Sequence, residues 1–367
     1  MVLIPENKQT TAATILRWYS DRPDSHRQHL GFSIIGGSCD RQLWYGFHWA
    51  STAHLSGRIR RLFETGHLAE DRFLSNLRAI GVEVQEVDPE TGEQFYYRSL
   101  GGHFGGSCDG IGKGFPEGPK TQAVVEFKTH SSKSFASLSK DGVQKSKPVH
   151  WAQMQCYMLS SNLTRALYLA VNKDTDDLYS EWIYYDRNAA LGFVDRAKRV
   201  IEAKEPLTPV TTDFTWWECK MCDHFNVCHS NKVSDRNCRT CAFSTPDTSD
   251  TSDTEGRWIC ERFNRPLSPA DQKAACQGHL FIPSLIPYGE PIDGGNDWVG
   301  YRHRANGTKF ANISENCERD AVPAEFTAGY TSRELIEVNA SVVADQLMTA
   351  IKDEFWGSQV TFIEDKT

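Results

Sequence analysis

Seven of the eleven cysteines in this 367-residue chain lie between positions 219 and 276. Such crowding constrains the fold, because clustered thiols are typical of a region that is cross-linked or that binds metal. The N-terminus lacks the charged-then-apolar pattern of a signal peptide, and no apolar run reaches the roughly 18 residues of a membrane span. We therefore expect a cytoplasmic protein without membrane contact, whose cysteines bind metal instead of forming disulfides.

Composition fits a globular protein with a sizeable core, since 39% of the residues are hydrophobic and 24% are charged. The length predicts one main domain with an appendage. The net charge of -8 argues against a protein that coats nucleic acid non-specifically, because such coating needs a broad positive field. A local basic groove remains compatible with this charge.

Hydrophobic periodicity and glycine or proline breaks predict the order of elements. That order is an α/β or α+β domain with a mixed central sheet. The predicted elements are one long helix or two abutting helices at 51–80, three strands of one sheet at 94–100, 101–111 and 121–130, a mobile serine- and lysine-rich connection at 131–148, a helix from near Pro148, strands at 166–171 and 179–186, and an amphipathic helix at 187–205.

The character of the chain changes after residue 214, where cysteines become frequent and 247–256 forms an acidic, low-complexity loop. The tail from 277 contains short aromatic segments and ends in a predicted helix near 341–356. We expect three parts: a domain over 1–230 closed by a cysteine cluster, a cysteine-rich metal-binding module over 231–285, and a small C-terminal domain of unknown role over 286–367.

Three short stretches carry the residues that suggest chemistry: GHLAE (66–70), GGSCDG (105–110) and VVEFKT (124–129). On a strand, Glu126 and Lys128 project from the same face while Phe127 points into the core. An exposed strand with a surface ion pair is the ordinary explanation. The flanking Val124, Val125 and Phe127 instead indicate a buried strand, where a charge needs a reason. Carboxylates that hold a hard divalent cation beside a lysine suit phosphodiester hydrolysis.

These residues resemble the PD-(D/E)XK nuclease superfamily, in the branch of phage recombination exonucleases, helicase-linked nuclease domains and CRISPR adaptation nucleases. Asp109, Glu126 and Lys128 match its core signature, although Cys108 stands where the family name has proline. Gly66 to Glu70 matches a Gly-x-x-x-Glu element on a preceding helix. Gln153 and Tyr157, at i and i+4 of one helix face, match Gln-x-x-x-Tyr.

The resemblance implies a restriction-endonuclease-like core, with a mixed sheet flanked by helices, and a site for Mg²⁺ or Mn²⁺. The ligands it implies are Glu70, Asp109, Glu126 and the Phe127 carbonyl, with His67 as a weaker candidate. Lys128 would orient the attacking water or stabilise charge. Gln153 and Tyr157 would position DNA.

A first cysteine set, Cys219-x2-Cys222-x5-Cys228, supplies three soft ligands within ten residues. A closed tetrahedral site needs a fourth ligand, for which His224, His229 and the distant Cys39 are candidates. The resemblance favours Cys39, because an iron-sulfur subgroup of this branch has one cysteine upstream of the core and three after it. It implies a [4Fe-4S] cluster that joins the two ends of the nuclease domain; Zn²⁺ on the same residues, or unconnected buried cysteines, are the alternatives.

A second set, Cys238, Cys241, Cys260 and Cys276, has the spacing of a structural metal site, with His279 as a spare ligand. We expect Zn²⁺ here, with the acidic loop extruded between the ligands. Cys108, Cys156 and Cys317 remain as ordinary packing residues.

Basic residues concentrate between the Glu-x-Lys strand and the Gln153 helix, in an otherwise acidic chain. A solvated loop would explain them, but we expect contacts to DNA phosphates from Lys133, Lys140, Lys145 and Lys147.

Together the motifs predict a metal-dependent DNA exonuclease that acts on single-stranded or duplex ends. Its expected setting is phage or prokaryotic recombination, replication or repair, in a prokaryotic cell or phage-infected host, with a single-strand annealing or recombination protein as a possible partner. An endonuclease or flap nuclease with the same site and a non-catalytic cysteine-rich nucleic-acid-binding module are the alternatives. The oligomeric state cannot be read from the chain.

Overall fold

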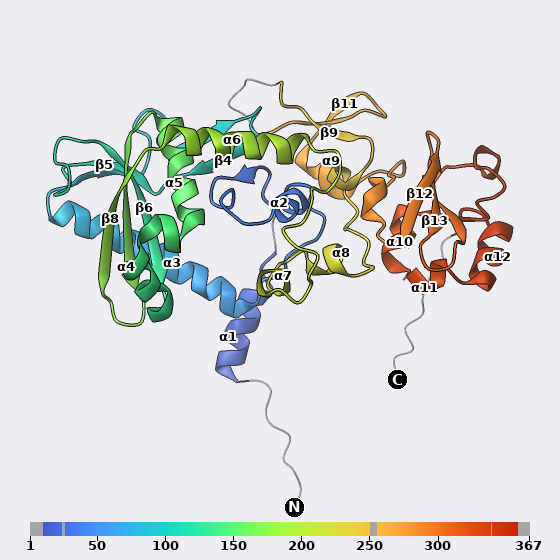
Figure 1. The fold of residues 1–367 in the computed structure, drawn as a ribbon, viewed down its shortest axis with the longest axis horizontal. Coiled ribbons are helices and arrows are strands. Elements are labelled where there is room, and N and C mark those ends of the chain that lie inside the picture. The colour runs from blue at the N-terminus through green and yellow to red at the C-terminus, as the bar shows by residue number, and fades with distance from the viewer. Residues whose placement is uncertain (1–9, 24–25, 250–254, 339, 359–367) are drawn as a thin grey trace, which may run out of the picture. The chain divides into compact units, whose positions relative to one another are not determined.

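The computed structural model describes residues 10–23, 26–249, 255–338 and 340–358 (Figure 1). The chain divides into two compact units, each assembled from separate segments. Unit 1 comprises residues 1–37, 53–99 and 104–198, and unit 2 comprises 38–52, 100–103 and 199–367. The part 250–254 of the predicted acidic loop lies outside the described residues. Within the described ranges, no helix combines the length and apolar character that crossing a membrane requires.

Unit 1 contains two sheets. Its strands are β1 (Leu30–Gly31), β2 (Glu83–Gln85), β3 (Tyr96–Ser99), β4 (Phe104–Ser107), β5 (Gly110–Lys113), β6 (Ala123–His130), β7 (Arg165–Asn172) and β8 (Leu178–Tyr184). The larger sheet has the order β2-β5-β6-β7-β8, in which only β6 and β7 are parallel. The smaller sheet has the order β1-β4-β3. The chain is therefore α+β, and the predicted mixed central sheet flanked by helices is confirmed.

The helices of unit 1 are α1 (Thr11–Ser20), α3 (Gly57–Ala79), α4 (Ser132–Ser146), α5 (Pro148–Ser161) and α6 (Arg187–Glu202), whose last turn belongs to unit 2. Helices lie on both faces of the larger sheet: α3 packs on one face, α4 and α5 contact β6 and β7, and α1 packs on α3 (Figure 1). Phe73, Leu74 and Leu77 of α3 pack with Val125 and Phe127 in one core. On the opposite face, α5 contacts Tyr168, which pairs with Glu126 across the strands. This arrangement buries both faces of β6.

Two expectations about unit 1 are wrong. Residues 131–148 are not a mobile connection but helix α4, which buries Leu138 and Val143 and is kinked at Gly142, where φ is 72°. Burial of these apolar residues outweighs the low helix propensity of serine. The stretches 94–130 also do not form three strands of one sheet. The expected strand 101–111 is two strands, and the break after Ser107 places β3 and β4 in a different sheet from β5 and β6.

Unit 2 is built from short elements. Its helices are α2 (Asp40–Phe47), α7 (Trp217–Lys220), α8 (Phe225–His229), α9 (Pro269–Ala274), α10 (Ser332–Glu337), α11 (Ala340–Val343) and α12 (Gln346–Glu354), with 3₁₀ turns at Cys238–Thr240, Pro283–Leu285 and Arg319–Ala321. Its strands are β9 (Ser244–Pro246), β10 (Trp258–Cys260), β11 (Arg265–Leu267), β12 (Gly289–Gly294), β13 (Trp298–His303), β14 (Lys309–Ile313) and β15 (Ala328–Thr331). They form the sheets β11-β10-β9 and β12-β13-β14-β15. The final helix expected near 341–356 is two helices.

A fully buried arginine organises the first half of unit 2. The Arg239 guanidinium lies 3.8 Å over the Trp49 ring, donates to the Phe47 carbonyl at 3.0 Å, and donates to Gln272 at 2.8 Å. A buried guanidinium is tolerated only when its donors find acceptors and its faces find aromatic rings. Arg239 therefore joins residues 38–52 to the cysteine-rich part of the chain.

Candidate functional site

The predicted Asp109, Glu126 and Lys128 come together on adjacent strands of unit 1. Asp109 directly precedes β5, and its Oδ2 accepts the Phe127 backbone N–H at 2.6 Å. Glu126 and Lys128 project from the same face of β6, as their spacing predicted, and Lys128 Nζ donates to Glu126 Oε1. Phe127 points to the other face, where its ring stacks on Phe73 at 5.1 Å. The sheet thus fixes two carboxylates and an ammonium side by side.

Glu126 is the most unusual group of this site, because its side chain is 0% exposed. Burial raises the pKa of its carboxyl to about 8; Lys128 opposes this increase and Asp109 adds to it. Glu126 Oε2 has no hydrogen-bond partner among the described residues. A buried carboxylate oxygen without a partner is costly, so this atom is suited to a ligand that the protein atoms do not supply.

Glu70 lies on α3 near these residues. Burial raises the pKa of its carboxyl, and the nearby charge of Asp109 raises it further. His67 Nδ1 lies 3.5 Å from Glu70 Oε2, but the His67 side chain is 76% exposed. Glu70 therefore belongs to the carboxylate group, whereas His67 sits at its solvent side.

A cavity of about 420 Å³ opens beside Lys128. Its lining comes from α3, from the end of β6, and from α4 and α5, and it includes Glu70, Lys128, His130, Lys147 and His150. Of the four lysines expected to contact DNA, Lys147 lines this cavity, whereas Lys133, Lys140 and Lys145 do not.

Two histidines of the cavity share a tyrosine that sequence reasoning did not find. The Tyr168 hydroxyl lies 2.8 Å from His130 Nε2 and 2.9 Å from His150 Nδ1. Burial lowers the pKa of His130 to about 4 and that of His150 to about 3. Both rings are therefore neutral at physiological pH, and the positive charge at this cavity comes from Lys128 and Lys147.

Gln153 and Tyr157 share a face of α5, as predicted, and Gln153 Nε2 donates to the Tyr157 hydroxyl at 3.1 Å. Tyr157 is only 1% exposed and donates to the Ser107 carbonyl, two residues before Asp109. Both side chains are buried, and the expectation that they position DNA stays a prediction. Through the Ser107 carbonyl, Tyr157 contacts the backbone that leads to Asp109.

The first cysteine set assembles within unit 2. Cys39 precedes α2, Cys219 lies in α7, Cys222 follows it and Cys228 lies in α8. All four cysteines line one small cavity of about 30 Å³, together with His224 and His229. Burial raises the pKa of the Cys222 thiol to about 11, and the nearby Cys228 and Cys39 raise it further. The structure therefore brings Cys39 to cysteines about 180 positions later in the chain.

The second set also converges in unit 2. Burial raises the pKa of the Cys238 thiol to about 12, with further increases from Cys241, Cys276 and Cys260. The spare candidate His279 is 2% exposed, and its Nε2 lies 3.0 Å from the Asn237 carbonyl oxygen. The remaining cysteines are buried, as expected of packing residues: Cys108, Cys156 and Cys317.

The carboxylate group and the two cysteine sets each bring their side chains close together, but closeness alone does not make a metal site. As the side chains stand, no three His, Cys, Asp or Glu residues in the described part of the chain are grouped so that they could hold a metal ion. At the carboxylate group, Glu126 is turned towards Lys128 and Asp109 towards the Phe127 N–H. Metal binding at the three sets therefore stays a prediction.

The raised pKa of Glu126 predicts how stability depends on pH in metal-free protein. An acid whose folded-state pKa is about 8, against an ordinary value of 4.5, stabilises the fold fully below pH 4.5, and this contribution is lost as pH rises through 8. We expect the free energy of unfolding to fall between pH 6 and pH 9, with a weaker decline in Glu126→Gln. Urea denaturation across this range measures it. Glu90→Gln, at an exposed position, serves as the control; equal pH slopes in all three proteins would contradict the burial of an ionisable Glu126.

No family model matches the chain, and no curated protein matches its sequence. Among solved structures, one described as SSO0001 is similar at 16% identity and a TM-score of 0.37, covering 59% of this chain and 95% of the other. An alkaline exonuclease from Laribacter hongkongensis, LHK-Exo, is similar at 15% identity and a TM-score of 0.35, covering 50% of this chain and 89% of its own. LHK-Exo in complex with dAMP gives 14% identity and a TM-score of 0.33, with the same coverage.

Proposed function

We propose that the chain is a metal-dependent deoxyribonuclease with its active site at the cavity beside Lys128. The observation that carries this proposal is Glu126, a fully buried carboxylate with one unpartnered oxygen, next to a lysine and two further carboxylates. A structural ion pair has no need of three converging acids. A hard divalent cation bound by oxygen ligands would offset their mutual repulsion.

The donor set fits Mg²⁺ or Mn²⁺, with Glu70, Asp109, Glu126 and the Phe127 carbonyl as the ligands that we assign. The cation would supply Lewis-acid stabilisation and an activated water. Lys128 keeps its positive charge, because the three carboxylates outweigh the effect of its burial on its pKa. That charge lies where it can stabilise a phosphate or orient a water. Tyr157 acts through the backbone that carries Asp109 and is a positioning residue.

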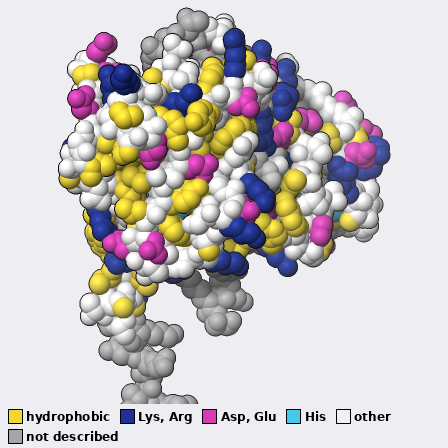
Figure 2. Space-filling model, turned by 60° about the vertical axis from the view of Figure 1, so that its left-hand side comes forward, with side chains coloured by type: hydrophobic (Ala, Val, Ile, Leu, Met, Phe, Trp, Pro, Cys, Tyr) yellow, Lys and Arg dark blue, Asp and Glu magenta, His cyan; other side chains and the backbone are white. Residues whose placement is uncertain are grey.

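DNA is the proposed substrate, with an exonuclease favoured by the resemblance of the motifs to recombination exonucleases. The face of the molecule in Figure 2 shows basic and acidic side chains intermingled, without a broad basic surface. Binding of a phosphate backbone would then depend on local lysines such as Lys147. Phage or prokaryotic recombination, with a strand-annealing partner, remains the proposed setting.

The two cysteine sets are proposed as structural metal centres. Four thiols around one cavity suit a soft metal, and metal binding would convert them into thiolates, including the Cys222 thiol, whose pKa burial raises. We assign a [4Fe-4S] cluster, or alternatively Zn²⁺, to Cys39, Cys219, Cys222 and Cys228. We assign Zn²⁺ to Cys238, Cys241, Cys260 and Cys276.

The nuclease assignment predicts Mg²⁺-dependent degradation of linear DNA that is lost on Glu126→Ala and on Lys128→Ala. We expect each change to lower the rate by at least about 100-fold, since Glu126→Ala removes a ligand of the cation and Lys128→Ala removes a positive charge beside the reacting phosphate. Release of end-labelled nucleotides measures the rate, and Lys113→Ala, at an exposed position of β5, is the control. Activity that survives both changes would refute the mechanism; cleavage of covalently closed circular DNA would identify an endonuclease.

Lys147 is expected to contact a DNA phosphate. In a Lys128→Ala background, which prevents degradation, Lys147→Ala should reduce the dependence of log affinity on log salt concentration by about 0.7 to 0.9. Fluorescence anisotropy with labelled DNA measures this slope. Lys140→Ala removes the same charge from an exposed position of α4 outside the cavity and should change the slope less. A slope for Lys147→Ala equal to that of the Lys128→Ala parent would remove Lys147 from the DNA contacts.

The first cysteine set predicts a coloured protein. After anaerobic purification we expect a visible thiolate-to-iron absorption band and about four iron atoms per chain, both lost on Cys39→Ser. Cys317→Ser is the matched control, because this buried cysteine lies outside both sets. A colourless protein that contains zinc alone would assign zinc to this set instead.

A further inference from the structure

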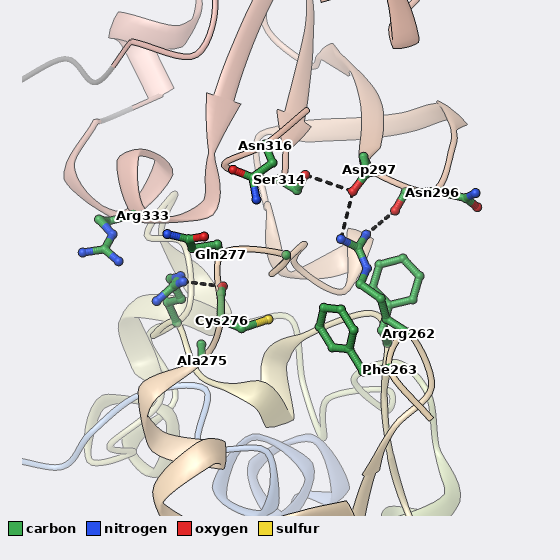
Figure 3. A pocket seen from close by; sticks show the side chains of 13 residues that line it. Arg262, Phe263, Ala275, Cys276, Gln277, Asn296, Asp297, Ser314, Asn316 and Arg333 are labelled. Carbon is green, nitrogen blue, oxygen red and sulfur yellow. Dashed lines mark hydrogen bonds and ion pairs between the residues drawn. The ribbon is translucent and has the colours of Figure 1, made fainter. Parts of the chain in front are cut away.

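A cavity that the proposed function does not explain lies in unit 2, with a lining that shares no residue with the cavity of the first cysteine set. It measures about 860 Å³ and is shown in Figure 3. Its lining combines guanidinium groups, an aromatic ring and side-chain amides, contributed by segments spread over about 100 residues. The lining residues that matter here are Arg236, Arg262, Phe263, Gln277, Asn316 and Arg333.

Three arginines at this cavity outnumber the carboxylates that face them. Glu315 is shared, at 3.7 Å from Arg236 and 3.4 Å from Arg333, and Asp297 pairs with Arg262 at 3.0 Å. Of the three guanidinium groups, Arg333 is the most exposed, at 55% against 11% for Arg236 and 15% for Arg262. Arg333 is therefore the group that an anionic ligand can approach from solvent.

Two of these arginines are held in fixed positions before any ligand arrives. Arg262 donates to Asp297 and to the Asn296 carbonyl, and its guanidinium lies 4.2 Å over the Phe243 ring (Figure 3). Arg236 donates to the Cys276 carbonyl at 2.6 Å. Arg333 is 55% exposed. A planar guanidinium fixed in this way is pre-organised for phosphate oxygens.

The cavity also contains groups that a simple anion would not use. Phe263 lines it and is 54% exposed, so one face of its ring is open to a planar partner. The amides of Gln277, Asn296 and Asn316 add hydrogen-bond donors and acceptors of the kind that base edges need. An aromatic ring beside pre-organised arginines is the combination that binds a single strand, with stacked bases and contacted phosphates.

We propose that this cavity binds a short segment of single-stranded DNA, with a phosphate at Arg333 and Arg236 and a base stacked on Phe263. The proposal rests on the proposed function, in that the strand would be the enzyme's substrate or product. The volume is within the range of roughly 300–1,000 Å³ typical of enclosed ligand sites, which suits one or two nucleotides. Duplex DNA does not fit, because its bases are stacked on one another and unavailable to Phe263.

The test separates the charge from the stacking. In the full-length Lys128→Ala protein, anisotropy would measure the binding of a labelled oligothymidylate and of an abasic oligomer of equal length, over a series of salt concentrations. Arg333→Ala is compared with Arg302→Ala, whose ion pair to Glu290 has the same 3.4 Å length and whose side chain is 50% exposed. Phe263→Ala is compared with Phe214→Ala, a phenylalanine that is 57% exposed.

We expect Arg333→Ala to lower the salt slope by about 0.7, with Arg302→Ala unchanged. Phe263→Ala should weaken binding of oligothymidylate about tenfold and leave the abasic oligomer unaffected, and Phe263→Trp should restore the affinity. If both alanine variants behave as their controls do, the site is refuted. Wild-type protein that degrades no DNA with Mg²⁺ would instead refute the proposed nuclease activity, which is a separate outcome from these binding measurements.

Discussion

The burial of Glu126 in the middle of a sheet is the constraint on which unit 1 depends. A carboxylate loses its hydration there, and only nearby groups can compensate for that loss. Lys128 provides one contact from the same strand, and Phe127 stacks on Phe73 so that α3 covers the opposite face. The Asp109 contact to the Phe127 N–H fixes the neighbouring strand. Three consecutive residues, 126–128, therefore provide both the packing of α3 on the sheet and the charged groups of the candidate site.

The local pattern of the sequence predicted much of unit 1. The long helix α3, the helix α5 after Pro148, strands β6 to β8 and helix α6 all follow from local sequence pattern, because each is long and either has one apolar face or is an apolar run between glycine or proline breaks. The alternation in VVEFKT also predicted which of its side chains share a face. The motifs at Gly66–Glu70, Asp109 and Glu126 also predicted residues that the structure brings together at the candidate site, without any knowledge of the pairing of strands.

What the sequence could not show depends on contacts between distant segments. Strand β1 is only two residues long and pairs with β4 more than 70 positions later. No local sequence pattern therefore predicts the smaller sheet β1-β4-β3. Helix α4 was missed because its serines suggest a loop, while its stability comes from burying Leu138 and Val143. Tyr168 carries no motif, yet its hydroxyl contacts both histidines of the cavity. The arginine cavity of unit 2 is likewise invisible in sequence, since its lining residues are scattered.

Residues 38–52 have a consequence for how the chain is made. They belong to unit 2, and apart from residues 100–103 the rest of that unit, including Arg239 above Trp49, begins at residue 199. During synthesis, Trp44, Trp49 and the rest of this segment must leave the ribosome about 150 residues before the groups that bury them. Until those groups are synthesised, the two exposed tryptophans can bind other apolar surfaces and cause aggregation. The yield of folded protein should therefore depend on how soon residues 199 onwards follow, and on chaperones that shield these tryptophans until then.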